Sequence, residues 1–199
     1  MTFLHMFASI LLGYLCGAIP FGLILTKSAG LGDVREIGSG NIGATNVLRT
    51  GNKKVAALTL VCDMLKGTAP VLIATYVFSP EAGILAGLAA FFGHLFPIWL
   101  GFKGGKGVAT NVGVLFGLSW PSAIAFLVVW LAMAFAFRIS SLAALTASLL
   151  TPFWLWLLGR NELLLPAFIL GASIWIMHRT NIVRLLKREE PRISFKKST

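Results

Sequence analysis

Two glycine-rich stretches of this chain carry the residue types that bind phosphate groups. The first motif, GSGNIGATNVLRTGNKK at residues 38–54, combines hydroxyl and amide donors with positive charge at its end. Its glycines allow successive backbone N–H groups to point into one concavity, which suits an anion. The candidate ligands are Ser39, Gly40, Asn41, Thr45, Asn46, Arg49 and Lys53. The alternative is a flexible connector at a membrane surface, whose Lys and Arg only set the topology.

The second motif, GHLFPIWLGFKGGKGVAT at residues 93–110, has a similar composition. Two lysines bracket a pair of glycines in the order Lys103, Gly104, Gly105 and Lys106. Positive charge is thereby concentrated beside backbone that a ligand can approach closely. A plain cytoplasmic loop would also carry lysines, but it would rarely need so many glycines. His94 is either a catalytic group or a hydrogen-bonded packing residue at a helix end.

Patterns typical of metal sites, P-loop nucleotide sites and serine-nucleophile sites are missing. The nucleotide loop G-x-x-x-x-G-K-[ST], the metal pattern H-E-x-x-H and the nucleophile pattern G-x-S-x-G do not occur in the sequence. Ser39 also lacks an evident His-Asp pair. We therefore expect no metal and no cofactor, and a serine nucleophile is disfavoured.

Composition indicates a polytopic membrane protein. Of the 199 residues, 57% are hydrophobic and 12% are charged, which is too apolar for an ordinary soluble domain. The net charge of +10 would suggest nucleic acid in a soluble protein. Here most Lys and Arg lie in loops and in the C-terminal tail, where the positive-inside rule explains them, so we exclude nucleic acid as a partner. Cys16 and Cys62 lie inside apolar runs and are expected to act as small core residues.

Seven apolar segments predict an all-α membrane protein with seven transmembrane helices. About 20 apolar residues in a helix cross the hydrocarbon core of a bilayer. The expected segments are residues 3–26, 55–78, 83–100, 108–118, 123–137, 142–158 and 163–177. We expect Pro20 to kink the first and Pro152 to distort the sixth. Residues 108–118 are too few to span as an ideal helix, so they form either a short or a re-entrant one.

The basic residues predict the orientation of the chain. The long loop after the first segment is basic and should face the cytoplasm, which places Met1 outside. The tail should also be cytoplasmic, since it carries Arg179, Arg184, Lys187, Arg188, Arg192, Lys196 and Lys197. All polar motifs then lie at one membrane face. Residues 1–199 are expected to form a single integral membrane domain.

Two charges lie inside the second apolar segment. Asp63 and Lys66 are three residues apart, so they share a helix face and can pair. Ionisable groups within a membrane are expensive, and a functional role is the default hypothesis for them. The alternative is a structural pair that joins helices.

A site rich in anion-binding groups and poor in carboxylates suits transfer of a group that is already activated. Such a reaction needs chiefly positioning and charge stabilisation. An acyl donor whose leaving group is phosphate would fit, as would a phosphorylated alcohol as acceptor. The competing class is a transporter or channel for an organic phosphate, although such proteins usually show an internal repeat and midplane sites. A non-catalytic scaffold would leave the density of glycine, asparagine and lysine unexplained.

Three segments of the chain resemble those of a known family. SGNIGATNVLR, GHLFPIWLGFKGGKGVAT and NIVRLL-x-x-x-E look like the three motifs of the bacterial acyl-phosphate-dependent glycerol-3-phosphate acyltransferases, and DMLKG at 63–67 is similar too. The resemblance implies acyl transfer from acyl phosphate to the 1-hydroxyl of sn-glycerol 3-phosphate, giving lysophosphatidate and phosphate, the first step of phospholipid biosynthesis. It also implies a multi-pass protein of the bacterial inner membrane, with a cytoplasmic active site. An association with the soluble enzyme that makes acyl phosphate is suggested as well.

The resemblance also implies roles for individual residues. The expected catalytic residues are Ser39, Arg49, His94 and Lys106. The expected substrate-binding residues are Gly40, Asn41, Thr45, Asn46, Lys53, Lys103, Gly104, Gly105, Asn181, Arg184 and Glu190. The family usually has glycine where this chain has Arg188. Because no side chain is an obvious general base, we hypothesise that the acceptor hydroxyl attacks the acyl carbonyl directly and that the donor's phosphate takes the proton.

Overall fold

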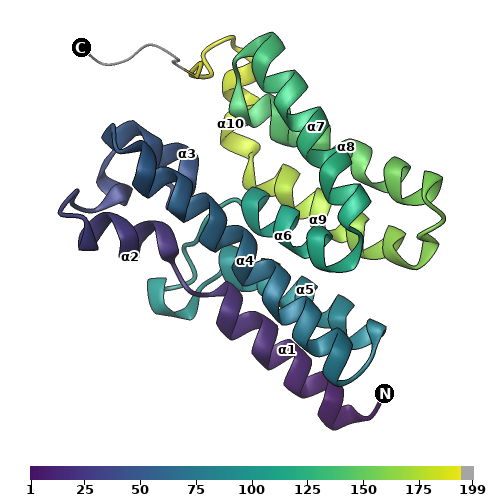
Figure 1. Ribbon diagram of the computed structural model, residues 1–199. Coiled ribbons are helices and arrows are strands. Elements are labelled where there is room, and N and C mark those ends of the chain that lie inside the picture. The colour runs from purple at the N-terminus through teal and green to yellow at the C-terminus, as the bar shows by residue number, and fades with distance from the viewer. Residues whose placement is uncertain (194–199) are drawn as a thin grey trace. The chain divides into compact units, whose positions relative to one another are not determined.

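The computed structural model describes residues 1–193, which form helices joined by turns and short loops (Figure 1). Lys196 and Lys197 of the basic tail lie outside the described residues. The chain divides into two compact units, Met1–Leu118 and Ser119–Thr199. The single domain expected over residues 1–199 stays a prediction.

The unit Met1–Leu118 contains both glycine-rich motifs. Its α-helices are α1 (Phe3–Gly17), α2 (Phe21–Ser28), α3 (Ala44–Val47), α4 (Lys53–Val77), α5 (Pro80–Leu95) and α6 (Val108–Leu118). Three 3₁₀ turns, η1 (Val34–Glu36), η2 (Leu48–Thr50) and η3 (Ile98–Leu100), lie in the connecting segments. Helix α1 packs on α5, and α4 packs on both α5 and α6. The long helices thus form a bundle, and the two motifs lie in its connections.

Small residues let these helices approach one another closely. A Cβ added at Gly17 on α1 would overlap the carbonyl oxygen of Ala90 on α5. Likewise, a Cβ at Gly113 on α6 would overlap the carbonyl oxygen of Met64 on α4. Lipid chains are as apolar as the side chains, so helices in membranes associate largely through such close packing.

The first apolar segment is interrupted at the proline where the sequence predicts a kink. Helix α1 ends at Gly17 and α2 begins at Phe21. Between them Pro20 has φ −88° and ψ 70°, and the Phe21 N–H donates to the Ile19 carbonyl oxygen at 3.1 Å. This is an inverse γ-turn, and it interrupts the helical hydrogen bonding at residues 18–20. Phe3–Ser28 still forms one candidate membrane span and is not among the helix pairs bent by more than 40°, so the span with a kink at Pro20 is confirmed at this level.

The unit Ser119–Thr199 contains the third motif. Its helices are α7 (Trp120–Phe137), α8 (Ser140–Leu157), α9 (Leu164–Met177) and α10 (Arg179–Leu186), with the 3₁₀ turn η4 (Asn161–Leu163) before α9. Helix α8 packs on α7 and α9. The helix starts at Trp120 and Ser140 precede the expected starts by a few residues, because capping residues are difficult to recognise within apolar runs.

Length and composition mark five helices of residues 1–193 as candidate membrane spans, or six if α9 and α10 form one bent span. The prediction of an all-helical membrane protein is confirmed at this level. Helix α6 has the predicted bounds and only 11 residues. Whether it is re-entrant, whether there are seven crossings and how the termini are oriented stay predictions.

Candidate active site

A buried asparagine organises the start of the first motif. The Asn46 side chain is 3% exposed, and its Nδ2 donates to the carbonyl oxygens of Val34 (2.8 Å), Ile37 (3.1 Å) and Asn41 (2.8 Å). Its Oδ1 accepts the Ser39 N–H at 3.0 Å. One amide therefore satisfies four backbone groups and fixes the path of residues 34–41.

Two glycines make that path possible. Gly38 and Gly40 have φ of 53° and 68°, in the left-handed region that other residues rarely adopt. A Cβ at Gly38 would also collide with the side chains of Asn46 and Arg49. The spacing from Gly38 to Gly43 matches G-x-G-x-x-G, but a dinucleotide loop joins a strand to a long helix. Here the segment joins η1 to the four-residue α3.

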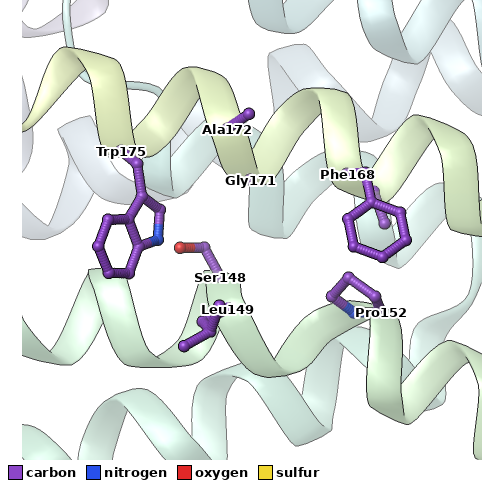
Figure 2. A pocket seen from close by; sticks show the side chains of 8 residues that line it. Ser148, Leu149, Pro152, Phe168, Gly171, Ala172 and Trp175 are labelled. Carbon is purple, nitrogen blue, oxygen red and sulfur yellow. The ribbon is translucent and has the colours of Figure 1, made fainter.

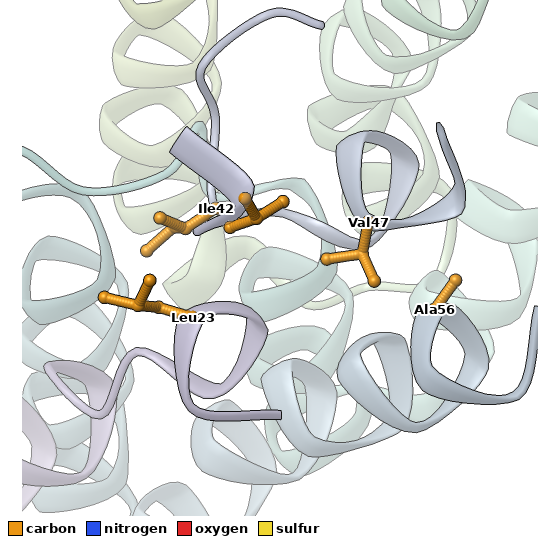
Figure 3. Packing of buried hydrophobic residues seen from close by; sticks show 5 residues of the cluster. Leu23, Ile42, Val47 and Ala56 are labelled. Carbon is orange, nitrogen blue, oxygen red and sulfur yellow. The ribbon is translucent and has the colours of Figure 1, made fainter. Parts of the chain in front are cut away.

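The first motif is anchored by apolar packing beneath it. Ile42 and Val47 form a buried cluster with Leu23 of α2 and Ala56 of α4, as Figure 3 shows. All four are at most 8% exposed. The loop is therefore seated on two helices, and its polar residues are presented by a fixed backbone.

The exposed side of the first motif is basic. Arg49 is exposed and donates to the Asn46 Oδ1 at 3.4 Å, and none of the ion pairs among residues 1–193 gives it a carboxylate partner. The predicted ligands Ser39, Gly40, Thr45 and Lys53 are also exposed, and Asn41 is half-buried. The Asn41 side chain accepts the Gly43 N–H at 2.8 Å, so it also shapes the loop.

The nearby acid Asp33 is already paired. Its carboxylate lies 2.6 Å from Arg35 and 3.5 Å from Lys27. The hydrogen bond from the Arg35 side chain holds the pKa of Asp33 well below its usual range. Asp33 therefore stays ionised and compensates Arg35 and Lys27.

The second motif folds back on the end of α5. The Gly104 N–H donates to the Leu95 carbonyl and the Gly105 N–H to the His94 carbonyl, each at 3.0 Å. Carbonyls at a helix C-terminus lack partners within the helix, and here two such groups are satisfied by the loop. Lys103 is exposed and Lys106 is half-buried.

A residue of α1 also holds the second motif. The Tyr14 hydroxyl donates to the Phe96 carbonyl at 2.8 Å, which ties α1 to the residue that ends α5. The sequence interpretation missed Tyr14, because one tyrosine in an apolar segment carries no local signal of its partner.

His94 is buried under the second motif. Its side chain is 3% exposed, and a Cβ at Gly105 would overlap the imidazole Nε2. Its Nδ1 lies 3.9 Å from the Asp63 Oδ1 and has no hydrogen-bond partner among the described atoms. His94 is thus a packing residue in this structure, and a catalytic role for it stays a prediction.

The predicted pairing of Asp63 and Lys66 is confirmed. The Lys66 Nζ lies 2.7 Å from the Asp63 Oδ1, and both side chains are 2% exposed. Helix α4 places them on one face because residues three apart are neighbours on a helix surface.

The third motif is a cluster around one carboxylate. Glu190 accepts hydrogen bonds from Ser141 Oγ at 2.7 Å, from Asn181 Nδ2, and from Arg184 Nε at 2.6 Å. Partial burial alone would raise the pKa of Glu190, but these hydrogen bonds and the Arg184 charge outweigh it, and the pKa is lowered. Asn181, Arg184 and Glu190 are brought together as predicted neighbours, and they hold one another.

Arg188 occupies a position that favours glycine. Its φ is 61°, and the Glu189 N–H bonds back to the Arg184 carbonyl at 2.8 Å. This is the left-handed C-terminal cap of a helix, where glycine is the usual residue. The presence of Arg188 where the family usually has glycine therefore affects the backbone conformation at this residue. The contacts of Glu190 form nevertheless.

The predicted site residues fall in both units. Those of the first two motifs lie in Met1–Leu118, and those of the third lie in Ser119–Thr199. Within residues 1–193, no group of three or more His, Cys, Asp and Glu side chains is placed to hold a metal ion.

An apolar groove runs between α8 and α9. It has a volume of about 280 Å³ and is lined by Ser148, Leu149, Pro152, Ala167, Phe168, Gly171, Ala172 and Trp175 (Figure 2). The one hydroxyl in it, Ser148, donates to the Leu145 carbonyl at 3.0 Å. The groove therefore offers hydrocarbon and aromatic surface, suited to a lipid chain.

A family model of the glycerol-3-phosphate acyltransferases matches residues 7–188 of this chain. The chain belongs to this family. Two similar curated proteins, both called glycerol-3-phosphate acyltransferase, come from Mesorhizobium japonicum and Agrobacterium fabrum. The first is 60% identical over 94% of this chain and 96% of its own length, and the second is 59% identical over 94% and 91%.

Two solved structures share the fold. Both are crystal structures of PlsY (YgiH), an integral membrane glycerol 3-phosphate acyltransferase. The glycerol 3-phosphate form is 41% identical, covers 95% of this chain and 96% of that chain, and has a TM-score of 0.90. The lysophosphatidic acid form is 40% identical, covers 95% of each chain, and has a TM-score of 0.88. The chain is thus an integral membrane protein of this acyltransferase family.

Proposed function

We propose that this protein transfers an acyl group from acyl phosphate to the 1-hydroxyl of sn-glycerol 3-phosphate. The products are lysophosphatidate and inorganic phosphate. Family membership supports the acceptor and the reaction class, and the acyl-phosphate donor is the finer part of the proposal. The observation that supports this function most directly lies in the first motif. There a fixed turn with glycines at 38 and 40 is followed by Arg49, which has no carboxylate partner among residues 1–193.

The residues of the first two motifs act by binding phosphate groups. Arg49 offers a planar, permanently charged guanidinium, which suits the two oxygens of a phosphate. Ser39 and Thr45 of the same motif are also exposed and add hydroxyl donors. Lys103 and Lys106 flank Gly104 and Gly105 and hold the second phosphate, where they offset the charge that develops in the transition state.

The reaction needs no covalent enzyme intermediate. The acceptor oxygen forms a bond to the acyl carbonyl carbon, and the bond from that carbon to the phosphate oxygen breaks. The hydroxyl proton passes to the departing phosphate. This route is supported by the burial of His94 and by the ion pair that already occupies Asp63, because neither is exposed to act as a base.

The His94→Ala variant tests this proton route. We expect the variant to retain turnover. Any decrease in activity should be accompanied by a decrease in the stability of the second motif. Complete loss of turnover, with both substrates still bound, would make His94 the base and overturn the route.

The membrane setting is also part of the proposal. Seven crossings, with Met1 outside and the motifs at the cytoplasmic face of the bacterial inner membrane, would let a soluble phosphorylated acceptor meet a membrane-borne acyl donor. The basic loops support this orientation through the positive-inside rule. Association with a soluble enzyme that makes acyl phosphate would supply the donor at the same face.

The test is product formation by purified protein. Acyl phosphate and glycerol 3-phosphate are supplied together, with acyl-CoA in a parallel reaction and Lys106→Ala as the site variant. We expect lysophosphatidate and phosphate from acyl phosphate alone, and a strong loss in the variant. Product from acyl-CoA instead would make the donor wrong, and no product from either would favour an organic-phosphate transporter.

A further inference from the structure

The ion pair on α4 reaches the break in the first apolar segment. The Lys66 Nζ donates to the Ile19 carbonyl at 2.8 Å, the same oxygen that accepts the Phe21 N–H in the γ-turn. The Lys66 ammonium also lies 5.8 Å from the centre of the Phe21 ring. A buried lysine therefore fixes the point at which α1 ends and α2 begins.

Helix α2 carries that position to the first motif. A Cβ at Gly22 would overlap the Ile42 carbonyl oxygen, so the start of α2 lies directly against the loop. Leu23, the next residue, is in the apolar cluster that seats Ile42 and Val47. A shift of α2 at its Pro20 end would therefore displace the backbone of the first motif.

The other end of the pair faces the second motif. The Asp63 Oδ1 lies 2.7 Å from the Lys66 Nζ and 3.9 Å from the His94 Nδ1. The imidazole in turn lies against Gly105, and the His94 carbonyl accepts the Gly105 N–H. The His94 side chain thus lies between the Asp63 carboxylate and Gly105 of the second motif.

We propose that Asp63 and Lys66 are positioning residues that set the two phosphate-binding motifs relative to each other. Lys66 acts through the Ile19 carbonyl and α2, and Asp63 acts through His94. The proposal rests on the proposed function for its kinetic consequence, but its structural consequence is independent of activity. A charged pair is suited to this task, since polar groups in the membrane strongly prefer the one arrangement that satisfies them.

The test removes the pair without leaving a lone buried charge. A single neutral substitution would leave its partner unpaired and destabilise the fold. The variant is therefore Asp63→Asn combined with Lys66→Met, which removes both charges and the donor to Ile19. The control is Leu155→Ala. Leu155 is a fully buried core residue of the other unit, and its substitution should lower thermal stability by about as much as the double substitution does.

Two readouts separate positioning from general stability. Hydrogen exchange should become faster at the Ser39, Gly104 and Gly105 amides in the double variant and stay unchanged in the control. The kcat/KM for glycerol 3-phosphate should fall about 10- to 100-fold, mainly through KM, because a displacement of about 1 Å costs that much in an oriented site. Unchanged exchange, or kcat/KM within twofold of the parent, would overturn the proposal.

A second variant leaves the ion pair intact. Gly22→Ala pushes α2 away from Ile42 and should produce the same rise in KM with faster exchange at Ser39 only. An unchanged KM and unchanged exchange would show that α2 does not position the first motif. If the parent protein forms no lysophosphatidate while the exchange results hold, the proposed function fails and the positioning role stands.

Discussion

The first and third motifs both depend on a buried asparagine, but the two asparagines hold different partners. Asn46 bonds to backbone groups and leaves the charge of Arg49 uncompensated by any described carboxylate. Asn181 bonds to the carboxylate of Glu190, which also pairs with Arg184. An added anion would therefore stabilise the first motif through Arg49. In the third motif the Glu190 carboxylate already pairs with Arg184. This difference favours a binding role for the first motif and a bracing role for the third.

Replacing each of the two arginines with alanine tests most directly whether the first motif binds substrate and the third does not. Arg49→Ala should lower kcat/KM about 100- to 1,000-fold, as the loss of a preorganised group that stabilises transition-state charge does. Arg184→Ala should lower it much less, with a larger part of the effect in thermal stability. Steady-state kinetics with glycerol 3-phosphate measures both.

Arg160→Ala is the control for loss of an exposed cation, since Arg160 pairs only with the exposed Glu162 among residues 1–193. Its kinetics should match those of the parent. Equal losses in Arg49→Ala and Arg184→Ala would mean that both motifs bind substrate, and the contrast drawn above would be wrong.

Replacing each of the two asparagines separates their effects on stability from their effects on substrate binding. Asn46→Ala leaves the carbonyls of Val34, Ile37 and Asn41 without this donor and should cost about 2–3 kcal/mol of stability, together with a raised KM. Asn181→Ala should lower stability with little change in KM. Thermal unfolding in detergent and kinetics on the folded fraction give the two quantities.

Thr50→Ala serves as the matched control in the first motif, because Thr50 makes a local hydrogen bond to Val47 at 2.7 Å. It should cost about 1 kcal/mol or less. If Asn46→Ala were as mild as this control, the asparagine would not organise the loop.

Part of the pH dependence of stability in the acid range should come from Glu190 of the third motif. The folded-state pKa of Glu190 is lowered, so its contribution is present above the unfolded pKa, near 4.5, and is lost as pH falls through the lower folded value. Thermal unfolding between pH 7 and pH 3 should show this loss. Glu190→Gln should flatten the profile in the acid range, whereas Glu189→Gln, at the exposed neighbouring residue, should keep the profile of the parent. If all three proteins gave parallel profiles, protonation of Glu190 would not be a cause of the loss of stability in acid.

The smallest effect is expected at Arg188. Arg188→Gly relieves a left-handed conformation and should raise stability by about 1 kcal/mol, without change in kcat. Lys187→Gly is the matched control at the same helix end, because Lys187 has φ −82° and should lose stability on substitution. A loss of stability in Arg188→Gly would mean that the arginine side chain makes a contribution larger than its backbone strain.

Much of the fold was predictable because membrane helices have a strong compositional signal. Helix α6 begins and ends where the sequence predicted, since Gly107 precedes it and the polar Ser119 follows it. The pairing of Asp63 and Lys66 followed from helical spacing alone. The kink at Pro20 followed from the proline itself, whereas the hydrogen bond from Lys66 to the Ile19 carbonyl, far along the chain, could not be predicted.

The membrane class, the helical character and the three polar motifs could be predicted from the residues alone, because they depend on composition and on spacing within one segment. The packing of the helices was needed to show that Asn46 binds backbone, that Glu190 pairs with Arg184, and that Tyr14 and Lys66 donate to distant carbonyls. Those partners are separated along the chain by as many as 82 residues. A hydrogen bond of that kind is specified by how helices pack, and no local pattern of residues contains that information.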